Sequence, residues 1–232
     1  MSGHDGYRRC RVPKGEMMAS HSAFLFDVDG TLVDSNDLHA EAWAETFRAF
    51  GHDIPTARIR FQIGKGGDNL IPALLPDASE GEREAMDEHR GPLFKRDYLP
   101  RVTPFPYVRE LFERLAGEAA AIMLASSSDQ SDVDHHVEML GISGLIRGAT
   151  SRDDAARTKP CPDIFAAALE LLGEPDKARV RVVGDSPWDM IAAGRIGLAA
   201  LGFRCGGFGE ADLRAAGASM MFDGPGDMLE RW

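Results

Sequence analysis

The sequence predicts an α/β fold, with a Rossmann-like parallel sheet core flanked by helices and an inserted helical cap domain. Short apolar runs without polar alternation are typical of strands buried on both faces, and they predict the sheet. Amphipathic stretches between these runs predict the flanking helices, because strand and helix then alternate along the chain. The insert is predicted from residues 34–103, where helical patterns occur without a convincing strand.

Six apolar runs are the strand candidates, and the third in the chain is the weakest. They span residues 23–28, 119–125, 145–150, 179–183, 198–203 and 219–222. Five stretches with helical spacing of apolar side chains are the helix candidates of the core. They span residues 108–115, 132–140, 164–172, 190–195 and 211–216. We therefore expect a core domain made of residues 22–33 and 105–232.

The rest of the chain divides into two further predicted parts. Residues 34–104 form the cap, in which Trp43, Phe47 and Phe50 follow helical spacing and are best interpreted as its apolar core. Residues 1–21 are polar and lack the apolar stretch of a signal peptide, so we expect a flexible N-terminal extension.

Composition and charge restrict the partners of the protein. The chain carries a net charge of −11, which repels nucleic acid and anionic membranes, and no stretch approaches the roughly 20 apolar residues of a membrane span. A phosphorylated ligand would be repelled too, so its site must supply positive charge locally, from a lysine or a metal ion. Cys10, Cys161 and Cys205 lie far apart, which favours reduced thiols over disulfides or a zinc site. We expect a cytoplasmic protein, either a monomer or a homodimer.

Ligands of an open parallel sheet bind beyond the carboxyl ends of its strands, so the residues after each apolar run are candidate site residues. Asp27 ends the first run, where a buried carboxylate is costly unless a metal ion or a positive charge compensates it. Asp29 lies two residues further on and can project to the same side. The alternative interpretation is a simple Asp-Gly turn at Asp29 and Gly30.

Three serines follow the second run. A hydroxyl and free backbone N–H groups at a strand-to-helix turn can hold a phosphate group. The alternative is N-capping of the next helix, for which serine is favoured. Both interpretations can hold together, with Ser126 for a ligand and Ser128 for the cap.

Lys159 lies after the weakest run, next to Pro160, which favours an extended backbone at the lysine. Pro162 suits the first turn of the following helix. This arrangement would hold a lysine that reaches inward. The alternative is an ordinary solvated surface lysine.

The run at residues 179–183 is followed by another acid, Asp185. Ser186, Pro187 and Asp189 fit the N-cap, first and third positions of a helix, where the helix dipole favours a carboxylate. Helix capping therefore explains Ser186 and Asp189 but leaves Asp185, at the end of an apolar strand, unexplained.

The segments DVDGT, LASSS, TKPCPD and GDSPWD place a pair of acids, a hydroxyl, a lysine and more acid at successive strand ends. In this order and context they resemble the four motifs of the haloacid dehalogenase superfamily. The resemblance runs from Ala23 to near the C-terminus. The helical insert resembles the C1-type cap of phosphoglycolate phosphatase and β-phosphoglucomutase relatives.

The resemblance implies a magnesium-dependent phosphatase that acts on a small phosphorylated metabolite. It makes Asp27 the nucleophile that forms an aspartyl phosphate, and Asp29 the general acid and then the general base. It gives Mg²⁺ the carboxylates of Asp27 and Asp185 and the backbone carbonyl of Asp29 as ligands. Asp189 would support these ligands without binding the ion itself.

The resemblance also implies how the phosphoryl group is held. Thr31, Ser126, the Ser127 amide and Lys159 are expected to bind its oxygens and to offset their charge.

In the cap, a glycine-rich turn contains Lys65, which could contact an anionic or polar part of the substrate. The alternative is a flexible turn with Asp68 as a capping residue. His39 lies on the first helix of the insert, near the site in related proteins, although a lone helix histidine is more often structural or solvated.

Two other functions on the same fold stay open, a β-phosphoglucomutase-like phosphomutase and a non-catalytic binding protein. Asp29 favours phosphatases and phosphomutases over dehalogenases, because a halide leaving group needs no proton. A mutase has to grip a second phosphate, for which Lys65, Lys95 and Arg96 are thin support. Thr31 stands where the mutase relatives tend to have an apolar residue. A pure binding protein has no need of a nucleophile paired with an acid.

Overall fold

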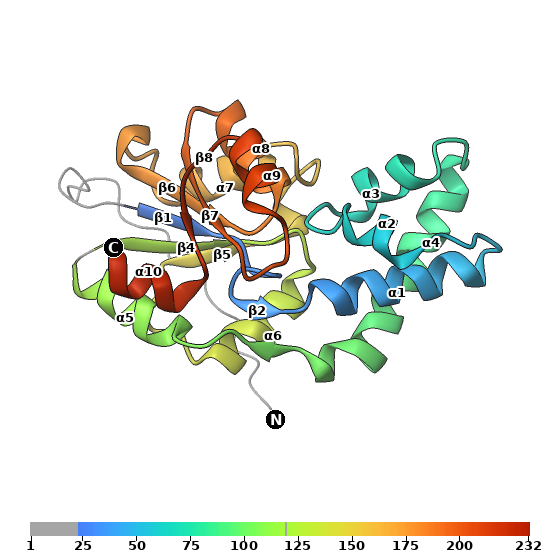
Figure 1. Ribbon diagram of the computed structural model, residues 1–232, viewed down its shortest axis with the longest axis horizontal. Helices are drawn as coiled ribbons and strands as arrows, with labels where there is room; N and C mark the ends of the chain where they lie inside the picture. The colour runs from blue at the N-terminus through green and yellow to red at the C-terminus, as the bar shows by residue number, and fades with distance from the viewer. Residues whose placement is uncertain (1–22, 119) are drawn as a thin grey trace, which may run out of the picture.

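The core of the protein is a six-stranded sheet that is parallel throughout (Figure 1). The computed structural model describes residues 23–118 and 120–232, so the predicted N-terminal extension and position 119 of the second apolar run lie outside the described residues. The strand order is β5-β4-β1-β6-β7-β8. The strands are β1 (Ala23–Phe26), β4 (Ala121–Ala125), β5 (Gly148–Thr150), β6 (Val180–Gly184), β7 (Ala199–Phe203) and β8 (Ala218–Phe222). Each of the six apolar runs contributes one of these strands, which confirms the predicted α/β core.

The first strand of the chain lies in the middle of the sheet, between β4 and β6. Phe24 and Phe26 pack against the helices on one face, and Ala23 and Leu25 pack on the other. All four side chains are at most 1% exposed. Since both faces are covered, every position of β1 is apolar, and the sequence shows a continuous run instead of alternation.

Helices cover both faces of the sheet (Figure 1). One face is covered by α5 (Val108–Gly117), α6 (Gln130–Leu140) and α10 (Pro225–Arg231). The other face is covered by α7 (Asp163–Leu171), α8 (Pro187–Arg195) and α9 (Glu210–Ala215). The five helices predicted for the core are all present. The sequence did not predict α10, because this helix is only seven residues long and begins with a Pro-Gly pair that is more typical of a turn.

A mostly helical region is inserted between β1 and β4, and we call it the cap. It contains α1 (Asn36–Ala49), α2 (Thr56–Arg60), α3 (Gly67–Leu74), α4 (Glu80–Leu93), the π-helical turn η1 (Phe94–Tyr98) and the 3-10 turn η2 (Leu99–Arg101). The chain leaves the core through β2 (Val33–Asp34) and returns through β3 (Thr103–Pro104), which pair antiparallel. Figure 1 shows α2, α3 and α4 standing beyond the end of the sheet, with α1 leading toward them.

The cap has its own apolar cluster, to which Trp43 and Phe47 belong and against which Phe50 packs. This confirms the interpretation of these aromatic residues as cap core. Leu38 and Ala42, on the same helix α1, pack instead with the apolar cluster of the core. α1 is therefore shared by the two apolar clusters and fixes one end of the cap against the sheet. Among the described residues, no helix combines the length and the apolar character needed to cross a membrane.

Candidate active site

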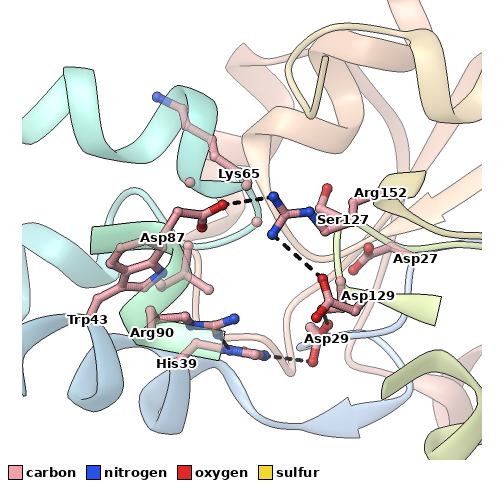
Figure 2. Close-up of a pocket in the computed structure, with 15 residues that line it drawn as sticks. Asp27, Asp29, His39, Trp43, Lys65, Asp87, Arg90, Ser127, Asp129 and Arg152 are labelled. Atoms are coloured by element: carbon pink, nitrogen blue, oxygen red, sulfur yellow. Dashed lines mark hydrogen bonds and ion pairs between the residues drawn. The ribbon is translucent and has the colours of Figure 1, made fainter. Parts of the chain in front are cut away.

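The candidate active site lies where the carboxyl ends of the central strands face the cap. A pocket there is lined by residues from both sides, as Figure 2 shows. Asp27, Asp29 and Ser127 come from the core, while His39 and Arg90 come from the cap helices. The site is therefore built at the edge of the sheet that the sequence predicts for it.

Three carboxylates gather at the ends of the neighbouring strands β1 and β6. Oxygens of Asp27, Asp185 and Asp189 lie within 4.8 Å of one another, and all three residues are buried. The backbone of Asp27 continues the sheet, because its N–H donates to the carbonyl of Val183 at 2.9 Å. Two strands that pair in register thus carry their terminal acids to the same place.

The glycine of the first motif makes this approach feasible. Gly30 has a φ of +77°, which favours glycine, and a Cβ at this position would overlap the Asn36 side chain and the Asp185 carboxylate. The Asp-Gly turn and the candidate site are therefore both present, since the turn brings the chain back past Asp185.

Two polar residues hold the acids in place. The Thr31 hydroxyl lies 3.1 Å from Asp27 Oδ2 and 3.2 Å from Asp185 Oδ1, between the two carboxylates. The amide nitrogen of Asn36 donates to Asp185 Oδ2 at 2.7 Å and to the carbonyl of Gly206 at 3.0 Å. Sequence reasoning missed Asn36, because a single Asn at the start of a helix has no signal that distinguishes it from a capping residue.

Lys159 is fully buried, so the alternative of a solvated surface lysine is wrong. Its ammonium group contacts Asp27 Oδ1 and lies 2.7 Å from Asp189 Oδ1. Burial disfavours the charged lysine, but the attraction of Asp189 and Asp27 outweighs this and raises the pKa of Lys159. The lysine is therefore charged and links the nucleophile candidate to the first turn of α8.

The cluster keeps an excess of negative charge even with Lys159 in place, since three carboxylates face one ammonium group. Burial raises the pKa of Asp27 well above its usual range, against the pull of Lys159, and the other two acids raise it further. Burial and then the Asp189 charge raise the pKa of Asp185 to about 7. Buried oxygen ligands with uncompensated negative charge fit a hard divalent cation.

Asp29 points to the cap side of the pocket and is not part of this carboxylate cluster. Its Oδ1 accepts from Ser35 at 2.7 Å and lies 2.8 Å from His39 Nε2, and its Oδ2 accepts from Ser128 at 2.8 Å. Burial would raise the pKa of Asp29, but His39 outweighs it by its charge and hydrogen bond, with smaller help from His136 and Ser35, so the pKa is lowered. Asp29 is therefore held as a carboxylate in a fixed orientation.

His39 is buried and belongs to the site, unlike the solvated helix histidine considered as the alternative. Burial lowers the pKa of His39 and the nearby Arg90 adds to this, although Asp29 opposes it. Arg90 Nη2 contacts Nδ1 of His39, which leaves Nε2 as the nitrogen that donates to Asp29.

The three serines after β4 differ in part from their predicted roles. The N-cap of α6 is Asp129, so the prediction that Ser128 caps this helix is wrong, and Ser128 instead donates to Asp29. Ser126 is buried, and its hydroxyl accepts from the Ser128 N–H at 3.0 Å. The hydroxyl of Ser127 lines the pocket, is buried, and has no hydrogen-bond partner among the described residues.

At α8, Asp189 Oδ2 accepts from the N–H and the hydroxyl of Ser186, as a capping residue does.

Lys65 lines the pocket from the glycine-rich turn, but its amino group points away from Asp27 and Asp29 (Figure 2). The Nζ atom donates to Gln62 Oε1 at 2.6 Å and lies 3.8 Å from the centre of the Trp188 ring. The contact of Lys65 with a substrate stays a prediction.

The same turn contacts the core at Thr158, next to Lys159. Asp68 accepts from the Thr158 N–H at 3.0 Å and also contacts its hydroxyl, and Gly66 N–H donates to that hydroxyl at 3.0 Å. The N-cap of α3 is Gly66, so the alternative of Asp68 as a capping residue is wrong. Asp68 holds the cap against the core instead.

Further ion pairs cross from the cap to the core. Arg152, after β5, lies 2.7 Å from Asp87 of the cap and 3.6 Å from Asp129. Lys95 of the cap lies 2.9 Å from Asp129. No sequence motif predicts these ion pairs, because they depend on the position of the cap relative to the core.

The comparisons with known proteins agree with this geometry. The family model for haloacid dehalogenase-like hydrolases matches residues 21–197. The chain belongs to this family. The resemblance on which the sequence analysis rested is confirmed, and the buried acids of this haloacid dehalogenase-like hydrolase lie inside the matched range.

Relatives of this hydrolase include solved structures and curated proteins. A hydrolase from Pseudomonas syringae has 30% identity and a TM-score of 0.84, over 90% of this chain and 97% of that one. The phosphoglycolate phosphatase of Aquifex aeolicus is 29% identical over 179 residues, which cover 75% of this chain and 80% of the relative. Protein SUPPRESSOR OF QUENCHING 1, chloroplastic, of Arabidopsis thaliana is 29% identical over 223 residues, which are 89% of this chain but only 20% of that protein.

Proposed function

We propose that this protein is a Mg²⁺-dependent phosphatase that hydrolyses a small phosphate monoester through an aspartyl phosphate on Asp27. The observation that carries the proposal is the surroundings of Asp27. A charged, fully buried lysine contacts one of its oxygens, two further acids lie beside it, and a separate, ionised Asp29 lies in the same pocket. A pure binding site has no use for a carboxylate nucleophile beside a second carboxylate suited to proton transfer.

In the first half of the proposed reaction, an oxygen of Asp27 attacks phosphorus and the bond from phosphorus to the ester oxygen breaks. Asp29 gives a proton to the departing oxygen, so that the product is an alcohol. The lowered pKa of Asp29 favours its ionised form, and the negative phosphoryl group of a bound substrate would raise this pKa and favour the protonated form.

In the second half, water attacks the phosphorus of the acyl phosphate. Asp29 takes a proton from this water, the bond between phosphorus and Asp27 breaks, and inorganic phosphate is released. Ser35, His39 and Ser128 hold the Asp29 carboxylate throughout, so the same group can serve both halves.

The acids fit a magnesium ion, which prefers oxygen ligands. We assign it the carboxylates of Asp27 and Asp185 and the backbone carbonyl of Asp29, with Asp189 supporting Lys159 beside it. When bound, the ion offsets the negative charge of the acids and of the phosphoryl oxygens.

The phosphoryl oxygens would be held by the Ser126 hydroxyl, the Ser127 amide, Lys159 and Thr31. The unpartnered hydroxyl of Ser127 supports a polar ligand at this turn, because a buried hydroxyl without a partner is costly.

Two of the three cap cations that were considered as support for a phosphomutase, Lys95 and Arg96, are paired with acids of the chain, which weakens that alternative. Lys95 is paired with Asp129, and Arg96 with Asp97 at 2.5 Å, so neither is free to grip a second phosphate. We place the enzyme in the cytoplasm, where the free thiols of Cys161 and Cys205 would stay reduced.

The test is phosphate release from p-nitrophenyl phosphate by the purified protein, with and without added Mg²⁺. We expect turnover that needs Mg²⁺ and is lost with a chelator, because a small, water-rich ligand set binds Mg²⁺ only moderately. Full activity after exhaustive chelation would contradict the metal site. Conversion of β-glucose 1-phosphate to glucose 6-phosphate without phosphate release, followed by phosphorus NMR, would favour the mutase.

A further inference from the structure

Arg90, on the cap helix α4, is a pocket cation without a directly paired carboxylate, although Asp29, Asp87, Asp129 and Asp132 attract it from farther away. Within residues 23–118 and 120–232, no carboxylate lies within 4.0 Å of its guanidinium, and its hydrogen-bond contact there is Nδ1 of the His39 ring. Its Nε atom is buried and has no hydrogen-bond partner in the described structure. Burial lowers the pKa of Arg90, but a guanidinium stays charged in proteins.

A second arginine in the same pocket shows what the usual arrangement looks like. Arg152 lies 2.7 Å from Asp87 and 3.6 Å from Asp129, so its charge is compensated by two acids. An arginine side chain that is removed from water without such a partner is costly to the folded state. Arg90 is partly buried, with its Nε atom fully buried and without such a partner, which points to a partner that is not part of the chain.

Aromatic rings fix the position of the Arg90 guanidinium. It lies 4.5 Å from the centre of the Phe94 ring and 5.6 Å from the Trp43 ring, and His39 stacks on Phe94 at 4.1 Å. Figure 2 shows the guanidinium above His39, facing the space bounded by Asp27, Asp129 and Arg152. A fixed, planar fork of donors suits bidentate binding of a carboxylate or phosphate.

We propose that Arg90 binds a second anionic group of the substrate, on the part of the molecule that leaves with the ester oxygen. The proposal rests on the function proposed above, and it defines the substrate class as small phosphate monoesters that carry a carboxylate or a second phosphate. The phosphoryl end lies against the acids and Lys159 on the core side, and the other anion lies against the cap.

Arg90 also contacts His39, which holds Asp29, so a merely positioning role has to be distinguished from anion binding. A positioning role would affect every phosphate ester alike, because Asp29 acts on all of them. Anion binding would affect only esters with the second charge. The decisive quantity is therefore the ratio of kcat/KM for esters with the second charge to kcat/KM for esters without it.

The test uses 2-phosphoglycolate, ethyl phosphate, in which a methyl group replaces the carboxylate, and ethane-1,2-diol bisphosphate, each with Mg²⁺. We expect the wild-type protein to prefer one of the two esters that carry a second anionic group to ethyl phosphate, by at least about tenfold in kcat/KM. The preferred ester identifies the second anion. In Arg90→Met, kcat/KM for that ester should fall by about 100-fold, with a change below about threefold for ethyl phosphate. Arg90→Lys should keep part of the preference.

Arg152→Met is the matched control, since it removes a pocket cation that is already neutralised by Asp87 and Asp129. Its preference for esters with a second anionic group over ethyl phosphate should stay that of the wild type. Equal losses on both kinds of ester in Arg90→Met, or no preference in the wild type, would overturn the proposal.

A binding measurement separates this proposal from the catalytic one. Calorimetry on the wild-type protein with Mg²⁺ compares 3-phosphonopropionate with propylphosphonate, which differ only in the second anion and cannot be hydrolysed as esters. Tighter binding of 3-phosphonopropionate that disappears in Arg90→Met supports the role of Arg90 even if no ester is turned over. Equal affinities would contradict it whether or not phosphatase activity is found.

Discussion

The core side and the cap side of the pocket are held together by different kinds of contact. On the core side, the acids follow paired strands and are fixed by their neighbours in the sheet, as Asp27 and Asp185 are. On the cap side, the residues are brought in by long-range ion pairs and hydrogen bonds, such as Arg152 to Asp87 and Asp68 to Thr158. The difference suggests that the core side determines the reaction and that the cap side determines which substrates undergo it.

The largest expected effect of a single substitution lies on the core side. Asp27→Asn removes the proposed nucleophile and a metal ligand while keeping the shape of the side chain, so turnover should fall by about 10⁴-fold or more. The unfolding temperature of the metal-free protein should be at least that of the wild type, because a buried carboxylate leaves a cluster with excess negative charge. Phosphate release and circular dichroism melts measure the two effects, and wild-type turnover would exclude the covalent mechanism.

An intermediate effect is expected from Asp185, through the pH dependence of stability without metal. Its pKa rises from 3.8 to about 7 in the folded protein, so folding favours the protonated acid. This stabilisation is fully present below about pH 4 and is lost as the pH rises through 7. The wild type should therefore lose stability relative to Asp185→Asn over this range, in urea melts with a chelator.

Added Mg²⁺ supplies the control for the Asp185 experiment. At pH 8 it should stabilise the wild type more than Asp185→Asn, because the ionised acid is the proposed metal ligand. A difference between the two proteins that does not change from pH 4 to pH 8 would mean that Asp185 is not strained by burial.

The smallest effect is expected on the cap side. Thr158→Val removes the hydroxyl that contacts Gly66, Asp68 and Asn69, at about 1 kcal/mol per lost hydrogen bond. We expect kcat/KM to fall by about tenfold and the unfolding temperature to fall by only a few degrees, because the contact seats the cap without forming part of either apolar cluster. Thr103→Val, at an exposed position of β3, is the matched control, and equal kcat/KM in both variants would contradict the proposed role of Thr158.

The same division explains what could be predicted from the sequence. The strands are continuous apolar runs because both faces of the sheet are covered, and the acids after them are conspicuous because they interrupt such runs. Asp27 and Asp185 could be found in this way, and the site followed from the parallel arrangement. Lys159 could be named as a candidate, but only the fold decides whether a lysine points inward.

The cap side could not be predicted in this detail. Ser128 and Asp129 are both suitable helix caps, and only the contact of Ser128 with Asp29 decides which of them caps α6. Arg90 lies in a charged helix whose sequence gives no sign of a pocket, since its surroundings come from other elements. Local patterns carry no information on such contacts.

The position of α1 limits how the enzyme could be rebuilt. Asn36 and His39 lie in the first turn of this helix, which the predicted boundary at residue 34 assigns to the cap, yet they bind Asp185 and Asp29. A chimera that takes its whole insert from a relative would replace these partners of the proposed catalytic acids along with the cap residues proposed to bind substrate. Grafts intended to change only the substrate should therefore keep the recipient's own α1 through His39 and exchange the segment that follows.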